Sequence, residues 1–390
     1  FTLDSNIDPN GGDQQRVYIQ QALLADIQQG DTLLLDDGRL TLQVTAKSST
    51  AATCIVIQGG VLSSKKGVNK FGGGLFADAL THKDMADIKT AAALKTDYLA
   101  ISFVRSREDV ELARRLLNAA GSNAHIIAKI ERAEAITETY LPGIIASADG
   151  VMVARGDLGV EIGDANLVAV QKHLIKAATN ANKVVITATQ MMESMINAPT
   201  PTRAEVFDVA NAVLDGTDAV MLSAETAVGK FPVETVNAMA RVIEGAERHP
   251  LTRRSKHRID QSFQHIDESL ALAAMYVANH LHGVKAVVCM TETGFTPLLM
   301  SRITSSLPIY DMASKPGTCE ITALYKGVVP VLFDATELAP AEINHRTVET
   351  LRASNVVTDG DLVLITKGDF INVQGGTNTL KIVRVGEAVQ

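Results

Sequence analysis

Short apolar runs alternate with polar segments along most of this chain, and each run has the length of a β-strand. Between residues 69 and 250, such runs begin near Tyr98, Ile126, Val151, Val184 and Ala219, and a helical pattern follows each one. Runs that are apolar on both faces are typical of strands in a buried parallel sheet. Strand–helix pairs in this number favour a (β/α) barrel over a flat sheet.

The number of strands is smaller than a closed barrel needs. A (β/α)₈ TIM barrel has eight strands, so the first three βα units are expected to be absent from this chain. The chain also starts at Phe1 rather than at a methionine, and its first residues have the pattern of the interior of a domain rather than of its start. We therefore expect that processing or truncation has removed residues ahead of Phe1.

Regions with other patterns lie on both sides of the predicted barrel. In the first of them, Asp36-Asp37-Gly38 is a hairpin signal between two apolar strands, which favours a small antiparallel barrel or sandwich. In the last region strands again alternate with helices, as in a separate small α/β domain. A charged stretch from His249 to Arg258 has the character of a linker. The expected domains of this α/β protein are therefore residues 1–68, 69–250 and 265–390.

Three features indicate how the helices of the predicted barrel begin and pack. Val110, Ala113 and Leu117 fall on one face of the segment after the first strand. Thr202 and Glu205 have the spacing of a capping box. Three methionines have helical spacing, and core packing is the role expected for them: they are Met191, Met192 and Met195.

Composition excludes several classes of partner. The 390 residues carry a net charge of −8, and no stripe of Lys or Arg stands out, so neither nucleic acid nor a membrane surface is an expected partner. No apolar run approaches the roughly 20 residues that span a bilayer, and no secretory leader is visible. The three cysteines lack metal-binding spacing and are typical of reduced thiols in a cytoplasmic protein.

Charged residues end two of the central apolar runs. Lys129 and Glu131 are two residues apart and therefore project to the same side of a strand. Asp157 closes the next apolar run, so it is expected beside them at the edge where such folds place their chemistry. Two carboxylates suit Mg²⁺, and a lysine beside them would neutralise a phosphoryl group in transit. We therefore predict a magnesium and phosphoryl site here.

A purely structural interpretation competes with this one. Lys129 and Glu131 could form a salt bridge at the barrel rim, with Asp157 capping a helix. The functional interpretation is favoured because the charges interrupt strongly apolar strands at the same relative place in two adjacent units, and charges are rarely buried without a purpose.

Two further residues near the strand ends are candidates for substrate contacts. Gly156 follows Arg155 and would let backbone N–H groups approach an anion closely, although a plain tight turn would also use a glycine. The Arg-Gly-Asp tripeptide is also a cell-adhesion signal, but here it closes a buried run rather than an exposed loop. Thr189 ends the following strand, where its hydroxyl would contact a substrate carboxylate or relay a proton.

A polar loop in the last region joins a strand to a helix. It contains Thr291, Thr293, Gly294 and Thr296. Hydroxyls and a glycine at a helix N-terminus form a phosphate site in many proteins, and a capped helix would explain the same residues equally well.

At these positions the chain resembles pyruvate kinase. The similarity runs over essentially the whole sequence, and it is closest to the bacterial type, which carries Ala224 in the last barrel motif. The matching stretches are Lys66–Asn69, Ile127–Glu131, Met152–Glu161, Ala188–Met195, Pro201–Glu205, Asp208–Asp218 and Met221–Thr226.

The resemblance implies a (β/α)₈ barrel with an inserted small β domain and a C-terminal α/β regulatory domain. It implies phosphoryl transfer from phosphoenolpyruvate to ADP, which gives pyruvate and ATP, with Mg²⁺ and often K⁺. Lys129 would stabilise the moving phosphoryl group, and Glu131 and Asp157 would hold Mg²⁺. Gly156, Asp157 and Thr189 would contact phosphoenolpyruvate or pyruvate, with Thr189 on the proton path to the enolate.

The family pattern also implies features outside the central site. The loop around Thr293 matches the place where a phosphorylated allosteric effector binds, and such proteins are usually homotetramers. The K⁺ ligands and an arginine for the substrate phosphate would lie in the part ahead of Phe1. We therefore expect little or no activity from the chain as given.

Two alternatives remain open. One is another magnesium-dependent barrel enzyme of phosphoenolpyruvate or 2-oxo-acid chemistry, such as a metal-dependent aldolase, which would not need ADP. The other is an inactive truncated relative that only binds sugar phosphates or nucleotides through residues 265–390.

Overall fold

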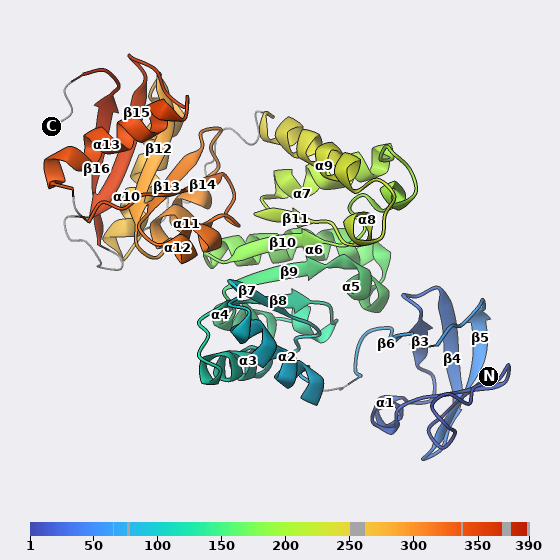
Figure 1. Cartoon of the computed structure of the whole chain (residues 1–390). Helices are drawn as coiled ribbons and strands as arrows, with labels where there is room; N and C mark the ends of the chain where they lie inside the picture. Colours follow the sequence, from blue (N-terminus) through green and yellow to red (C-terminus); the bar gives the residue numbers. More distant parts are fainter. Residues whose placement is uncertain (65, 76–78, 250–261, 337, 369–375, 388–390) are drawn as a thin grey trace. The chain divides into compact units, whose positions relative to one another are not determined.

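The computed structural model describes residues 1–64, 66–75, 79–249, 262–336, 338–368 and 376–387 (Figure 1). The chain divides into two compact units, Phe1–Gln190 and Met191–Gln390. The three domain boundaries expected from the sequence stay a prediction. The predicted linker lies outside the described residues apart from His249.

The first unit begins with a small β region. A single sheet has the strand order β2-β1-β5-β4-β3-β6, and it is antiparallel apart from the parallel β1–β2 pair. Asp36, Asp37 and Gly38 all have positive φ, which confirms the predicted hairpin between β3 and β4. The elements are β1 Thr2–Asp4, β2 Arg16–Tyr18, α1 Gln21–Asp26, β3 Thr32–Leu35, β4 Leu40–Lys47, β5 Ala51–Gln58 and β6 Val68–Lys70.

Four parallel strands in the order β10-β9-β8-β7 follow in the same unit. Every residue of β9 is buried, as expected for a strand covered on both faces. A Cβ at Gly150 would lie 2.6 Å from Ile127 Cδ1 and 2.9 Å from Val184 O, so only glycine fits where β9 begins. The strands are β7 Tyr98–Ile101, β8 His125–Ile130, β9 Gly150–Ala154 and β10 Val184–Ala188.

Helices connect these strands, as the alternating pattern predicted. Val110, Ala113 and Leu117 of α3 are buried, which confirms the predicted helix face. The helices are α2 His82–Ala93, α3 Arg107–Ala119, η1 Glu134–Ile136, α4 Leu141–Ser147, α5 Arg155–Ile162 and α6 Asp164–Asn180.

The second unit starts with the fifth predicted strand and its helices. Thr202 and Glu205 form the predicted capping box, and the three predicted core methionines are fully buried. The elements are η2 Glu193–Ile196, α7 Arg203–Asp215, β11 Ala219–Met221, α8 Ala224–Ala227 and α9 Pro232–Glu247.

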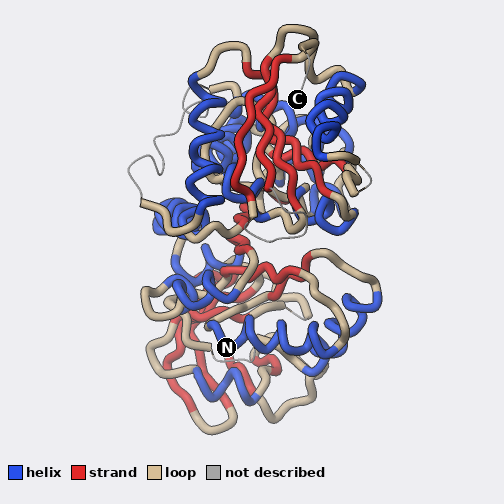
Figure 2. The backbone as a smooth tube through the Cα atoms, turned by 90° about the vertical axis from the view of Figure 1, so that its left-hand side faces the viewer, coloured by secondary structure: helices blue, strands red, loops and turns tan. Residues whose placement is uncertain are grey.

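The C-terminal part is the predicted α/β domain. Its sheet has the order β14-β13-β12-β15-β16 and is parallel except for the antiparallel β15–β16 pair. Figure 2 shows helices on both sides of these strands. The elements are α10 Ile266–His280, β12 Val284–Thr291, α11 Phe295–Ser301, β13 Ile309–Ala313, α12 Pro316–Thr322, β14 Val328–Leu332, α13 Pro340–Ala353, β15 Leu362–Gly368 and β16 Thr377–Arg384.

A carboxylate in the core of this domain gives its stability a dependence on pH. Asp311 on β13 is fully buried. Its Oδ2 accepts a hydrogen bond from the Thr322 hydroxyl, whereas its Oδ1 has no hydrogen-bond partner among the described residues. Burial raises the pKa of Asp311 from 3.8 to about 6.

This raised pKa predicts that the domain is more stable in mild acid. Between about pH 4 and 6 the folded state keeps a proton that the unfolded state has lost, so the free energy of unfolding falls as the pH rises, by about 3 kcal/mol. Asp311→Asn should remove this dependence and raise stability at pH 7.5 relative to the parent. Urea unfolding followed by circular dichroism at pH 4.5 and 7.5 measures the effect, and equal pH dependence in both proteins would contradict it.

Candidate active site

Lys129 and Glu131 meet at the end of β8. Lys129 Nζ lies 2.6 Å from Glu131 Oε1 and donates to Ser102 Oγ at 2.9 Å. The backbone N–H of Phe103 donates to Glu131 Oε2 at 2.6 Å. The Glu131 side chain is 2% exposed, while that of Lys129 is 25% exposed. The carboxylate is therefore fixed from two sides, and the ammonium group keeps access to solvent.

Asp157 lies in a different element from the one expected. Strand β9 ends at Ala154, and Asp157 belongs to the first turn of helix α5. The reason lies in the pattern: Leu158 and Glu161 are buried three residues apart, which is a helical period rather than a strand period. The expectation that Asp157 closes a strand was therefore wrong.

The same edge brings Gly156 and Thr189 together. The Gly156 N–H donates to Thr189 Oγ1 at 2.8 Å, and the Thr189 hydroxyl donates to Ala188 O at 2.6 Å. Buried Arg155 donates through Nε to Ala188 O at 3.2 Å and through Nη2 to Thr189 O at 2.5 Å. These contacts join the end of β10 to the start of α5.

Backbone strain marks three positions at this edge. Thr189 has φ +70°, Gln190 has φ +55° and Phe103 has φ +54°, a region that non-glycine residues rarely occupy. Such conformations cost energy and persist where surrounding contacts hold them, often at functional sites. At Phe103 the strained turn aims a backbone N–H at Glu131, and at Thr189 it sets the hydroxyl beside Gly156.

Negative charge accumulates around Asp157. Burial raises the pKa of Asp157, the charges of Glu131 and Asp37 raise it further, and Lys129 opposes them. Strands β8 and β9 are parallel neighbours, so the end of β8, with Lys129 and Glu131, and the first turn of α5, with Asp157, lie at the same edge of the sheet. A divalent cation between the carboxylates would relieve this repulsion.

The donor set fits Mg²⁺ rather than a metal held by protein alone. No group of three or more His, Cys, Asp or Glu residues within the described part of the chain is placed to hold a metal ion. Mg²⁺ is usually bound by one or two carboxylates and completed by water and substrate phosphate. Glu131 and Asp157 would supply those two carboxylates.

Sequence reasoning missed the groups that hold the site in place. Ser102 and Phe103 follow β7, the strand that pairs with β8. Because residues that follow neighbouring parallel strands lie at the same edge of a sheet, their position in the sequence could have placed them in the site. Arg155 was considered only as part of a tripeptide, yet it is 7% exposed and anchors the end of β10.

The loop predicted to bind an effector lies at the carboxyl end of β12. Gly294 has φ +79° and its N–H donates to Thr291 Oγ1 at 3.0 Å. Thr296 is buried and its hydroxyl pairs with that of Thr377 at 2.8 Å, whereas the Thr293 side chain is exposed. Effector binding here stays a prediction, with Thr293 as the member of the set that a ligand would reach.

Comparison with protein families gives two matches that together span most of the chain. Residues 1–236 match the family model of the pyruvate kinase barrel domain. Residues 268–383 match the model of the pyruvate kinase alpha/beta domain. None of the described helices is long and apolar enough to cross a membrane.

Curated relatives agree with these matches. The chain is 54% identical over 387 residues to pyruvate kinase II of Salmonella typhimurium, an alignment that covers 99% of this chain and 80% of the relative. It is 52% identical to pyruvate kinase of Buchnera aphidicola over the same shares of both chains. These alignments do not support the expectation that the chain is truncated and has little activity.

A solved structure shows the same architecture. The chain matches a pyruvate kinase from Cryptosporidium parvum with a TM-score of 0.89 and 32% identity, over 98% of this chain and 78% of that one. The expected fold class, a barrel with an α/β C-terminal domain, is thereby confirmed. The chain belongs to the pyruvate kinase family of phosphotransferases.

Proposed function

We propose that this chain transfers the phosphoryl group of phosphoenolpyruvate to ADP at the edge formed by Lys129, Glu131, Asp157 and Thr189. The observation that carries the proposal is the ion pair of Lys129 and Glu131 at the end of β8, with Asp157 in the first turn of the helix that follows the neighbouring parallel strand β9. In the reaction the bond between phosphorus and the enol oxygen breaks, and a bond from phosphorus to a β-phosphate oxygen of ADP forms. The enolate then gains a proton at carbon and becomes pyruvate.

Each residue has a role that follows from its contacts. Lys129, which is partly exposed and held by Ser102, stabilises negative charge on the phosphoryl group as it moves. Glu131 and Asp157 hold Mg²⁺, which when bound neutralises phosphate oxygens. Gly156 is the second residue of helix α5, which begins at Arg155, and the N-terminal N–H groups of a helix favour an anion such as the substrate carboxylate.

Thr189 is assigned to the proton path. Its oxygen accepts from the Gly156 N–H and its own proton is directed to Ala188 O, so its orientation is defined before substrate binds. A hydroxyl has too high a pKa to be a strong acid by itself, and we therefore assign it to relaying a proton from solvent to the enolate.

Several finer properties come from the family rather than from these contacts. The enzyme uses K⁺, for which no residue of this chain is assigned. It binds a phosphorylated effector at the loop around Thr293. It is a homotetramer and is located in the cytoplasm.

A coupled assay with lactate dehydrogenase tests the proposed reaction. Pyruvate formation from phosphoenolpyruvate should depend strictly on both ADP and Mg²⁺, because ADP is the phosphoryl acceptor. Pyruvate formation without ADP would instead favour an aldolase or another 2-oxo-acid enzyme. The same assay also decides the separate expectation of low activity, which the comparisons do not support.

A further inference from the structure

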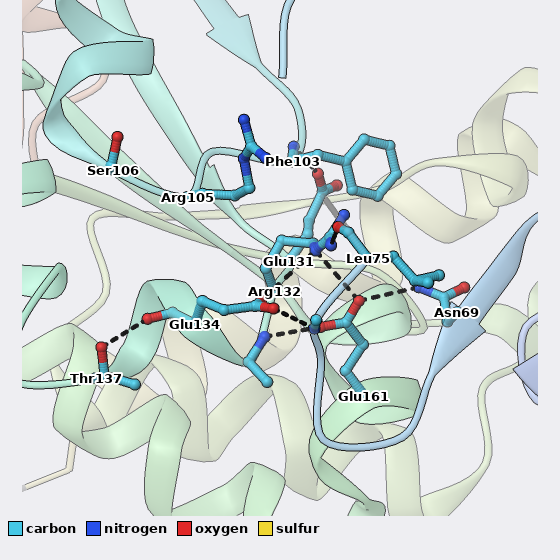
Figure 3. A network of polar contacts seen from close by, with 12 residues as sticks. Asn69, Leu75, Phe103, Arg105, Ser106, Glu131, Arg132, Glu134, Thr137 and Glu161 are labelled. Atoms are coloured by element: carbon cyan, nitrogen blue, oxygen red, sulfur yellow. Dashed lines mark hydrogen bonds and ion pairs between the residues drawn. The ribbon is translucent and has the colours of Figure 1, made fainter. Parts of the chain in front are cut away.

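Glu161 is a buried carboxylate one turn after Asp157 on helix α5, and the reaction described above makes no use of it. It is 1% exposed. Its Oε2 accepts from the Ala133 N–H at 2.8 Å. Its Oε1 lies 3.3 Å from Arg132 Nε and accepts from Asn69 Nδ2 at 3.4 Å. Figure 3 shows these contacts converging on the one carboxylate.

The partners of Glu161 come from two different regions. Arg132 and Ala133 directly follow Glu131, the proposed metal ligand. Asn69 belongs to β6, which pairs with β3 in the small β region. Glu161 itself shares helix α5 with Asp157. One carboxylate therefore touches the segment after one metal ligand, the helix of the other, and the small β region.

The chain that leaves the small β region lies along this same network. The Gly72 N–H donates to Glu161 O at 2.8 Å. Arg132 donates to Leu75 O, and the Gly74 N–H donates to a carboxylate oxygen of Glu134. These contacts fasten the stretch after β6 to Glu161 and to the residues that follow Glu131, and Figure 3 shows Leu75, Arg132, Glu134 and Glu161 of this network.

The hairpin turn of the small β region also reaches α5. A Cβ at Gly38 would lie 3.7 Å from Val160 Cγ2, so the turn lies close to the residue before Glu161. Helix α5 is thus contacted by the small β region at two places while its first turn carries the catalytic edge.

We propose that Glu161 is a positioning residue that couples the placement of the small β region to the geometry of the metal ligands Glu131 and Asp157. The inference rests on the proposed function. All three groups that reach its carboxylate are donors, so the position needs a side chain that only accepts. A glutamine side chain has the same shape, but one carboxylate oxygen is replaced by an NH₂ group, which is a donor. This NH₂ group would face another donor, either the Ala133 N–H or Arg132, and the repulsion would push the segment after Glu131 away.

Binding of Mn²⁺, used as a spectroscopic probe for Mg²⁺, tests the coupling in the full chain. Electron paramagnetic resonance measures the concentration of free Mn²⁺ in the sample. Glu161→Gln should raise the Mn²⁺ dissociation constant about tenfold, since loss of a partner behind a metal ligand typically costs 10–100-fold in affinity. Asn69→Ala should raise it less, and the double variant should match Glu161→Gln alone, because Asn69 acts through Glu161.

A matched control lies at the other end of the same strand. Asp149 accepts from the Ile126 N–H at 2.7 Å and from Arg114 at 2.8 Å, so it holds the start of β8 as Glu161 holds the segment beyond its end. Asp149→Asn should lower the melting temperature without changing Mn²⁺ affinity. Equal weakening by Asp149→Asn and Glu161→Gln, or no weakening by Glu161→Gln, would overturn the inference.

Two further outcomes are also decisive. If Glu161→Gln does not fold, Asn69→Ala decides the question: unchanged Mn²⁺ affinity in that variant overturns the coupling, and weaker affinity supports it. If the parent binds no Mn²⁺, or binds it equally well after Glu131→Gln, the proposed metal site itself is wrong, and the inference is overturned with it.

Discussion

Replacing Lys129 with methionine is expected to slow phosphoryl transfer by about a thousandfold and to leave divalent-cation binding intact or tighter. The loss follows because a positive charge aimed at a developing negative charge is worth about two to three orders of magnitude in rate. The retained binding follows because Lys129 Nζ lies 2.6 Å from Glu131 Oε1. Removing the ammonium frees that oxygen for the cation.

The rate relative to the parent chain and the Mn²⁺ dissociation constant measure the two parts of this prediction separately. Glu131→Gln is the matched variant, because it breaks the same ion pair from the other side and should weaken Mn²⁺ binding. If Lys129→Met lost its cation affinity together with its rate, the lysine would be holding the site together rather than acting on the phosphoryl group.

Replacing Arg302 with methionine is expected to cost the second unit about 3–5 kcal/mol of stability. Arg302 and Asp218 form an ion pair whose side chains are 1% and 0% exposed, with Arg302 Nη1 donating to Asp218 Oδ2 at 2.9 Å. The Lys326 N–H also donates to Asp218, at 3.0 Å. Without Arg302 the carboxylate of Asp218 stays buried but loses its main charge partner, which destabilises the folded state.

Thermal unfolding followed by circular dichroism measures this effect, and a unit of this size should lose about 10 °C. Asp218→Asn in the Arg302→Met background should recover part of the loss, because it removes the uncompensated charge. Arg352→Met is the control: its partner Asp359 is 67% exposed, so its loss should barely move the transition. An equal shift for both arginine variants would contradict the account of the buried pair.

Sequence patterns predicted the elements of the barrel region well because each depends on neighbouring residues. The β9 run from Gly150 to Ala154 is apolar at every position after the glycine and proved to be fully buried. The capping box at Thr202 and Glu205 depends on two residues three positions apart and was confirmed. The same local rule misplaced Asp157, because an apolar strand ran directly into a helix without a separating turn.

The surroundings of the site were harder to predict because they join distant segments. Phe103 reaches Glu131 across 28 positions, and Asn69 reaches Glu161 across 92. No periodicity connects such pairs. Positive φ at Phe103 and Thr189 also has no local sequence signal, since neither is a glycine or an asparagine. The charged and polar residues near the strand ends were readable from the sequence, while the contacts that fix their geometry needed the fold.

X-ray diffraction from crystals of this chain soaked with Mn²⁺ and phosphoenolpyruvate tests the central claim most directly. An anomalous difference map should show one manganese ion with carboxylate oxygens of both Glu131 and Asp157 within about 2.5 Å, the range of direct oxygen coordination to divalent cations. A manganese ion bound elsewhere, or touching only one of the two carboxylates, would contradict the assignment of this edge as the magnesium and phosphoryl site.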